Sequence, residues 1–339
     1  MQKYIFLFAT FLLLLCGCSG SNEEELQEFG RLSINVRLSS MTSQARASID
    51  NYLVEGDGME DVTIMLVNSK NVVTFIESVN NLVGNEQESK LVTIESTDLK
   101  LGQYSLYAFG NLQNTCFTEV SSVINGLKQG DVLSADFNNM LFHALEGTDT
   151  PVFDSEHPML LSARKLVDIS MQNNSTTIDL VRPVVKFEVR LYNHSVQNMT
   201  INDLSFSSFN ASKGYVLSHD GNVPASVEYR NLPAYETTNP IVVGAGKSAT
   251  IYDAVLFENR APSYLMNMSL QVSEDEMGVI NNSQLRTINR QTGEVVPMIE
   301  QLRNQHVIVM VNAYYNKQEN QFKFDVVGWD NKEENVEFN

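Results

Sequence analysis

The most regular pattern in the chain lies between residues 31 and 38. In the segment RLSINVRL the residues Leu32, Ile34, Val36 and Leu38 are apolar, and the residues between them are polar. A period of two is typical of a β-strand that has one buried face and one solvent face. We therefore expect a strand here whose aliphatic side enters a core.

Short aliphatic or alternating runs continue along the chain and predict further strands. We expect them near 62–67, 72–76, 91–95, 104–110, 159–171, 177–181, 183–191, 199–208, 213–218, 247–257, 264–273, 285–290, 306–316, 321–329 and 335–338. One helix is predicted at 118–128, where Val120, Val123, Ile124 and Leu127 have helical spacing and Thr118 is the expected N-cap. The pattern indicates an all-β protein with one short helix.

Length and composition indicate more than one domain. The chain has 339 residues, of which 43% are hydrophobic, which is enough for two domains with their own cores. The polar stretch from Gln172 to Thr176 is the expected boundary, so we predict β-sandwich domains at 31–174 and 175–339.

The charge and the chemistry-bearing residues exclude several classes of function. The net charge of −18, without a basic patch, argues against nucleic acid as a partner and against attraction to an anionic membrane surface. The chain lacks an HExxH motif and a nucleophile elbow, and its histidines are far apart, at positions 143, 157, 194, 219 and 306. We therefore predict no catalytic residues, no metal ligands, no cofactor and no enzyme activity.

The first residues have the pattern of an export signal. Lys3 precedes an apolar run from Ile5 to Cys16, which is too short to span a bilayer as a helix. The sequence Leu15-Cys16-Gly17-Cys18 resembles a bacterial lipobox. The resemblance implies that residues 1–17 are a lipoprotein signal peptide and that Cys18 carries acyl chains that anchor the protein to a membrane. An ordinary signal peptide with chance cysteines is the alternative.

A polar, acidic segment follows Cys18. Residues 18–30 contain a run of three glutamates at 23–25, and a segment of this composition is expected to be a flexible tether. It resembles the export signal of Bacteroidetes surface lipoproteins, which implies that the precursor is lipid-anchored at the cell outer membrane and exposed at the cell surface. A solubilising linker is the alternative.

The order of these features resembles a known family. The lipobox, acidic tether, alternating strand, polar run, Arg46-Ala47 and the strand VTIMLV are together similar to the Bacteroidetes fimbrillins, the subunits of type V pili. YSLYAFGN at 104–111, VRPVVKFEVRL at 181–191 and the strand that ends in Gly328-Trp329 agree with the resemblance. The resemblance implies a transthyretin-like fold for the two tandem antiparallel sandwiches.

The resemblance also implies a mechanism and partners. In this family an arginine-specific protease removes the leading strand of the lipidated precursor, and the C-terminal strand of another subunit fills the groove that is left. The scissile bond would be Arg46–Ala47, the removable segment 31–46, and the displaced strand the one that carries Leu32, Ile34, Val36 and Leu38. The implied partners are the protease, other pilus subunits of the same or a related kind, and the outer membrane, through the lipid.

Several alternatives remain open from the sequence. Arg46 can be an ordinary surface arginine, because some family members act as anchors and keep their leading strand. The donor can be the strand with Phe322, Phe324 and Val326, or that strand can close its own sandwich and leave Val336 and Phe338 as the donor. Beyond a stalk subunit, the open functions are a membrane-retained anchor, a tip adhesin and a glycan-binding surface lipoprotein of a nutrient-uptake system.

Overall fold

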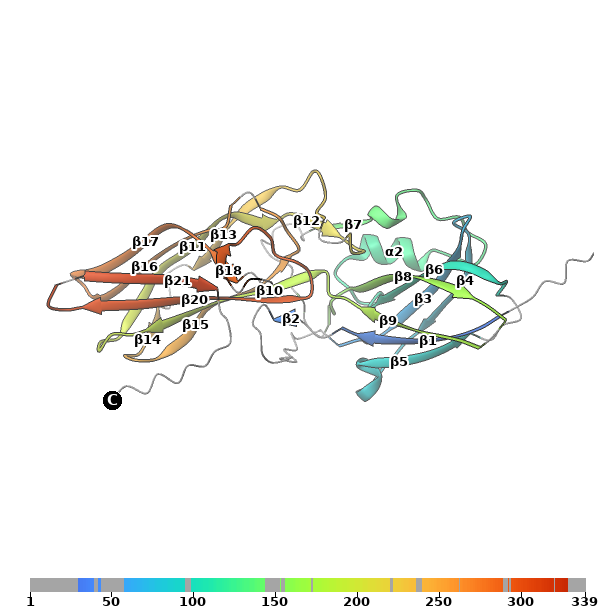
Figure 1. Ribbon diagram of the computed structural model, residues 1–339, viewed down its shortest axis with the longest axis horizontal. Coiled ribbons are helices and arrows are strands. Elements are labelled where there is room, and N and C mark those ends of the chain that lie inside the picture. Colours follow the sequence, from blue (N-terminus) through green and yellow to red (C-terminus); the bar gives the residue numbers. More distant parts are fainter. Residues whose placement is uncertain are drawn as a thin grey trace, which may run out of the picture.

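The computed structural model describes residues 30–39, 42–43, 58–94, 99–143, 153, 156–171, 173–219, 222–235, 240–261, 263–288, 292, 294–319 and 321–328. These residues form two β-sandwiches arranged end to end along the long axis of the molecule (Figure 1). They contain many strands and one α-helix, which confirms the predicted all-β fold class. No helix in the described ranges combines the length and apolar character that crossing a membrane requires.

The first sandwich packs a three-stranded sheet on a four-stranded sheet. The smaller sheet has the order β5 (Ser89–Ile94), β1 (Arg31–Leu38), β9 (Asn173–Leu180). The larger sheet has the order β4 (Val73–Val79), β3 (Val62–Asn68), β6 (Gly102–Gly110), β8 (Leu161–Ile169). Aliphatic side chains of both sheets, with Ile34, Leu66 and Leu106 wholly buried, fill the space between them.

The other face of the larger sheet is covered by irregular and helical segments. They include α2 (Thr118–Asn125), the 3₁₀ turn η2 (Phe137–Asn139) and the short strand β7 (Leu141–His143), while the 3₁₀ turn η1 (Gly84–Gln87) precedes β5. Three details of the helix prediction are wrong. The helix ends at Asn125 and not at residue 128. The N-cap is Phe117, without a side-chain cap, and Val123 is 51% exposed, because only Val120 and Ile124 of α2 reach the core.

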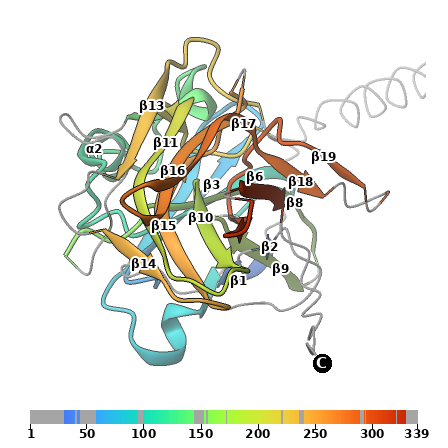
Figure 2. The same ribbon diagram turned by 90° about the vertical axis from the view of Figure 1, so that its left-hand side faces the viewer.

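The second sandwich also has two sheets. One contains β15 (Ser248–Phe257), β10 (Val184–Asn193), β20 (Gln305–Asn316), β21 (Gln321–Gly328) and the two-residue β2 (Thr42–Ser43). The other contains β13 (Tyr229–Tyr235), β11 (Met199–Ala211), β16 (Leu265–Ser273), β17 (Glu276–Gln284) and β14 (Ile241–Val243). A hairpin of β18 (Arg286–Ile288) and β19 (Val295–Pro297) projects to one side (Figure 2).

The two sandwiches share a joint. β12 (Lys213–Tyr215), which follows β11, pairs with β7 of the first half of the chain. One buried cluster combines residues of both halves, and its rings of Phe142 and Phe257 lie 4.8 Å apart. Beside this cluster, Arg303 forms a buried ion pair with Glu258 at 2.8 Å. The joint is therefore packed like a protein interior.

Strand direction separates this fold from a simple series of hairpins. β1 runs parallel to β9, and β10 runs parallel to β20, whereas the other long pairs are antiparallel. Because β9 belongs to the sheet of β1 and β10 to the second sandwich, we propose that the domain boundary falls between them, at residues 181–183.

Candidate functional site

The leading strand β1 lies in the middle of its sheet. It pairs antiparallel with β5 from Leu32 to Arg37, and parallel with β9 along its whole length, from Arg31 to Leu38. A strand with partners on both edges would leave two unpaired edges facing each other if it were removed. We call the space between β5 and β9 that β1 occupies the β1 slot.

The inward side chains of β1 are part of the core. Leu32 is 1% exposed, Ile34 and Val36 are 0% exposed, and Leu38 is half-buried at the end of the strand. Full burial of such a side chain stabilises the folded state by about 1.5–3 kcal/mol. These residues therefore make β1 a major contributor to the stability of the first sandwich.

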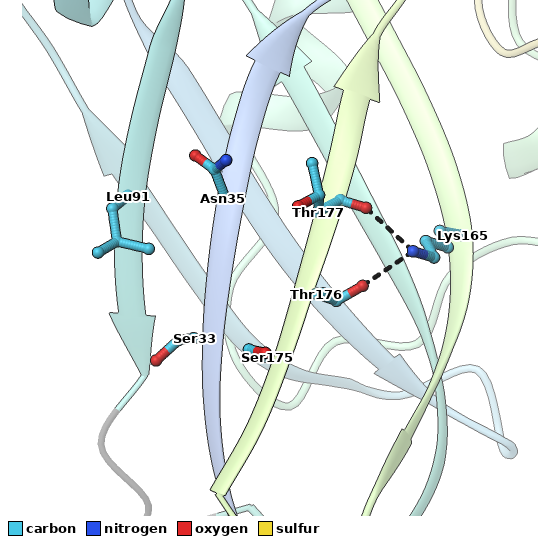
Figure 3. Close-up of a pocket in the computed structure, with 7 residues that line it drawn as sticks. All are labelled: Ser33, Asn35, Leu91, Lys165, Ser175, Thr176 and Thr177. Atoms are coloured by element: carbon cyan, nitrogen blue, oxygen red, sulfur yellow. Dashed lines mark hydrogen bonds between the residues drawn. The ribbon is translucent and has the colours of Figure 1, made fainter.

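The outward face of β1 is polar and open. Ser33 and Asn35 lie beside Ser175 and Thr177 of β9 and Leu91 of β5 in a shallow depression (Figure 3). The contacts here are surface contacts, such as the hydrogen bond of 2.9 Å that the Ser89 hydroxyl donates to Asn35. The side chains of β1 are therefore packed on the inner face, while its backbone pairs with β5 and β9.

A lysine of the larger sheet reaches the same depression. Lys165 of β8 donates hydrogen bonds of 3.0 Å to the Thr176 hydroxyl and to the Thr177 carbonyl oxygen (Figure 3). Arg37, on the same outer face, pairs with Asp179 at 2.7 Å, and both side chains are about half exposed. An exposed ion pair of this kind contributes less than about 1 kcal/mol.

The chain directly after β1 crosses from the first sandwich to the second. The Ser39 amide donates to the Leu180 carbonyl at 2.8 Å, and the Ser39 carbonyl accepts a hydrogen bond from Arg182. Asn304 donates to the Ser39 hydroxyl at 3.2 Å. Further on, β2 pairs in parallel with Gln305 and His306 at the start of β20. The leading segment, in its described residues 30–39 and 42–43, thus contacts both sandwiches.

The sequence did not indicate the residues that hold this crossing. Arg182 and Asn304 are buried and hydrogen-bonded to each other at 3.0 Å, although they come from distant parts of the chain. Asn304 has a positive φ of 58°. An Asn can adopt this backbone conformation more readily than most residues, but a lone Asn carries no signal of a long-range contact.

Other predicted site residues lie outside the described part of the chain. These are the lipidation residue Cys18, the processing residues Arg46 and Ala47, and the candidate donor residues Val336 and Phe338. Their predicted roles stay predictions.

The other candidate donor strand, β21, lies at the edge of the second sandwich. Phe322, Phe324 and Val326 are half-buried and pack against its core, and the Phe322 ring lies 4.6 Å from that of Tyr315. Both phenylalanine rings cover Gly278 of β17, where an added Cβ would come within 2.6 Å of Phe322 and 2.8 Å of Phe324. The missing side chain of Gly278 therefore makes room for β21 in its own sandwich.

We predict that Gly278→Ala destabilises the second sandwich by about 1–3 kcal/mol, because the new methyl group overlaps two rings that are already packed. The measurement is urea unfolding, followed by the circular dichroism of the β-strands. Gly244→Ala is the matched control, since its added Cβ would meet the flexible Lys247 side chain at 3.4 Å. An equal loss of stability in the two variants would contradict the conclusion that Gly278 makes room for the rings of β21.

A buried polar cluster lies on β10, β15 and β20, close to where β2 pairs. The Glu188 carboxylate accepts hydrogen bonds from His306 at 2.9 Å, Arg190 at 2.6 Å and Thr250 at 2.6 Å. Burial alone would raise the pKa of Glu188, but these three hydrogen bonds outweigh burial and hold its pKa well below the ordinary value of 4.5.

A depressed pKa predicts how this cluster responds to pH. Its contribution to stability is complete above pH 4.5, the unfolded value, and is lost as the pH falls below it toward the lower folded value. Glu188→Gln should cost about 1–3 kcal/mol at neutral pH and less at pH 3, measured by urea unfolding. The exposed Asp179→Asn is the control, with little effect expected at either pH. A loss from Glu188→Gln that is the same at both pH values would contradict this assignment.

The site as a whole offers packing and strand pairing rather than reaction chemistry. Among the described residues, no group of three or more His, Cys, Asp or Glu side chains could hold a metal ion. The fold and the β1 slot define a protein of two sandwiches that share one leading segment.

Comparison with known proteins identifies the family. The profile of the family described as fimbrillin-A associated anchor proteins Mfa1 and Mfa2 matches residues 30–335, and the chain belongs to this family. It is therefore a fimbrial protein and not an enzyme, as its sequence predicts. No curated protein matches the sequence.

Solved structures of fimbrial and adhesion proteins share the fold. The tip fimbrial protein Mfa3 of Porphyromonas gingivalis has 12% identity and a TM-score of 0.54, with 89% of this chain and 100% of that chain covered. A protein assigned to cell adhesion from Parabacteroides distasonis has 14% identity, a TM-score of 0.54 and coverages of 89% and 97%. The fimbrilin FimA of Porphyromonas gingivalis has 10% identity, a TM-score of 0.50 and coverages of 88% and 98%.

Proposed function

We propose that this chain is a cell-surface fimbrial subunit that supports adhesion and is assembled by exchange of its leading strand. The observation that carries the proposal is the position of β1, which is paired on both edges and has Leu32, Ile34 and Val36 fully buried. Its removal would expose two strand edges and an apolar groove, and such a groove binds a replacement strand strongly.

Processing at the Arg46–Ala47 bond would release β1. The other arginines of the leading segment are less suitable for cleavage. Arg31 lies at the start of β1, so cutting there would leave the strand in place, and Arg37 lies within the paired strand. Arg46 follows β1 in a polar part of the sequence, where proteolytic nicking is most common.

This subunit would in turn donate a C-terminal strand to another subunit. The two candidates are β21, with Phe322, Phe324 and Val326, and the segment with Val336 and Phe338. Phe322 and Phe324 of β21 pack over Gly278 of the same sandwich, which favours β21 as a permanent strand of that sandwich. The segment with Val336 and Phe338 is therefore the better donor candidate.

The precursor would reach the surface as a lipoprotein. In this proposal Cys18 carries the acyl chains, residues 1–17 are removed, and the acidic tether places the protein on the outer face of the outer membrane. Metabolic labelling with a palmitate analogue tests this step in cells. The label should be present on the wild-type protein and absent from Cys18→Ser, and label on both proteins would contradict the assignment.

A membrane-retained anchor is the second candidate function. The description of the matched family names anchor proteins. The leading segment also pairs with both sandwiches, through Ser39 and through β2, which would favour retention of β1. An anchor would keep β1 in place and act through its lipid and its C-terminal strand.

Limited proteolysis separates the two candidates. We would treat the purified precursor without its lipid with an arginine-specific protease, sequence the new N-terminus and measure the oligomeric state. We expect a new start at Ala47, release of the leading segment and binding of strands from other fimbrial subunits, with Arg46→Ala resistant. A chain that resists cleavage, or that keeps β1 after it, would instead support the anchor.

A further inference from the structure

We propose that the β1 slot accepts only a strand with aliphatic side chains at the positions of Leu32, Ile34 and Val36 and, where the strand extends to the position of Gly30, with glycine there. The candidate donor segments of this chain do not meet this requirement. The slot of one copy is therefore filled by a strand from a different subunit and not by a second copy. This inference rests on the proposed strand exchange and adds a rule for the partner.

The closed end of the slot is at Gly30. Gly30 is buried and donates its amide hydrogen to the Leu99 carbonyl at 2.9 Å. A Cβ added at Gly30 would lie 2.4 Å from Ile169 Cγ2 and 2.6 Å from the Ser170 carbonyl oxygen. The carbonyl belongs to the backbone, so it cannot move away as a flexible side chain would. Any strand that extends this far therefore needs glycine here.

The next three inward positions lie in a dense aliphatic core. Leu32, Ile34 and Val36 are at most 1% exposed, and wholly buried leucines such as Leu106 and Leu180 belong to the same cluster. Interiors of this kind are close-packed, so an aromatic ring in place of Ile or Val would push neighbouring side chains out of position. The slot therefore selects aliphatic side chains of about the native size.

The segment of β21 meets only part of the rule. If Gly328 takes the place of Gly30 and the chain runs in the direction of β1, the three inward positions receive Asp330, Lys332 and Glu334, which are charged. In the reverse direction the inward positions receive Val326, Phe324 and Phe322. The spacing then fits, but two aromatic rings would occupy the places of Ile34 and Val36.

The segment with Val336 and Phe338 would bring a glutamate into the slot in either direction. Placing Val336 at Leu32 and Phe338 at Ile34 puts Glu334 at the position of Gly30. In the reverse direction, with Phe338 at Leu32 and Val336 at Ile34, Glu334 falls at Val36. A buried, unpaired carboxylate is strongly unfavourable in either place.

The partner strand is thus defined by its chemistry. It carries Gly-x-aliphatic-x-aliphatic-x-aliphatic, with polar residues between, because the alternate positions correspond to the open face of Ser33 and Asn35. Within the proposed assembly, the subunit that fills the β1 slot of this chain is therefore of a different kind from this chain.

A peptide-exchange experiment tests the rule. A site for a sequence-specific protease is inserted after Ala47 in the full chain, so the test does not depend on cleavage at Arg46. After the cut, fluorescently labelled peptides compete with the resident strand, and binding is measured by anisotropy. The peptides are residues 29–43, the same peptide with Gly30→Val or Ile34→Phe, the matched outward control Asn35→Gln, and residues 317–331 and 328–339 of this chain.

We expect the 29–43 peptide and the Asn35→Gln control to bind similarly. The Gly30→Val, Ile34→Phe, 317–331 and 328–339 peptides should bind at least about tenfold more weakly. Binding of either C-terminal peptide as tightly as 29–43, or no effect of Gly30→Val, would overturn the rule.

The same rule can be tested by the stability of the intact, uncut protein. Gly30→Val and Ile34→Phe should lower the midpoint of urea unfolding, whereas Asn35→Gln should leave it near that of the wild type. If no peptide enters the cut protein, strand exchange fails as the proposed function, and the intact variants still decide the rule. Unchanged midpoints for Gly30→Val and Ile34→Phe would then overturn it.

Discussion

Replacing Ile34 by Asp is expected to unfold the first sandwich. Ile34 is 0% exposed in the middle of β1, between β5 and β9. Loss of a buried isoleucine side chain costs about 2–5 kcal/mol, and a buried carboxylate without a partner adds several more. The sum is comparable with the net stability of a whole domain, about 5–15 kcal/mol. Urea unfolding and protease resistance of the purified protein measure the effect.

The neighbouring residue provides the control for this prediction. Asn35 points to the open face of the same strand, so Asn35→Asp introduces the same charge into solvent and should change stability by less than about 1 kcal/mol. A first sandwich that stays folded in Ile34→Asp would mean that β1 is not part of its core. The basis of the proposed strand exchange would then be lost.

Breaking the buried ion pair between Glu258 and Arg303 is expected to have the second largest effect. The Arg303 guanidinium donates to Glu258 at 2.8 Å, to the Tyr215 carbonyl at 2.8 Å and to the Val216 carbonyl at 3.2 Å. Arg303→Leu would leave the Glu258 carboxylate buried without its charge partner, at a cost of about 3–5 kcal/mol. Because Tyr215 and Val216 belong to the joint, the two sandwiches should also move more freely.

The measurements are urea unfolding and hydrogen exchange of β7 and β12. Arg260→Leu is the matched control, because Arg260 forms an exposed ion pair with Glu300 and its loss should cost less than about 1 kcal/mol. The double variant Glu258→Leu with Arg303→Leu should recover part of the loss, since it removes both charges. Equal effects of Arg303→Leu and Arg260→Leu would contradict a special role for the buried pair.

Local sequence predicted the elements whose pattern is strong. The alternation at 31–38 gave a strand with the predicted inward residues, because the period of two depends only on backbone geometry. β13 and β17 were not predicted. Proline at 233 and the glycine and paired asparagines of β17 have low strand propensity, and these segments are strands because neighbouring strands pair with them.

The candidate site was predictable only in part. The alternating pattern predicted β1 and its inward residues, whereas its displacement, which the family resemblance implies, stays a prediction. Gly30 and Gly278 gave no such signal, because the need for glycine comes from Ile169 and Ser170 in one case and from Phe322 and Phe324 in the other. These contacts join residues far apart in the sequence.

By itself, the sequence determined the all-β class, the net negative charge and the inward face of the leading strand, since these follow from composition and local periodicity. Only the tertiary structure decided that β1 is the central strand of its sheet and that Arg182 and Asn304 bind the chain after it. A strand's own residues specify which side is buried. Which strands lie beside it depends on packing over the whole chain. That packing also determines the shape of the slot that a replacement strand would have to fit.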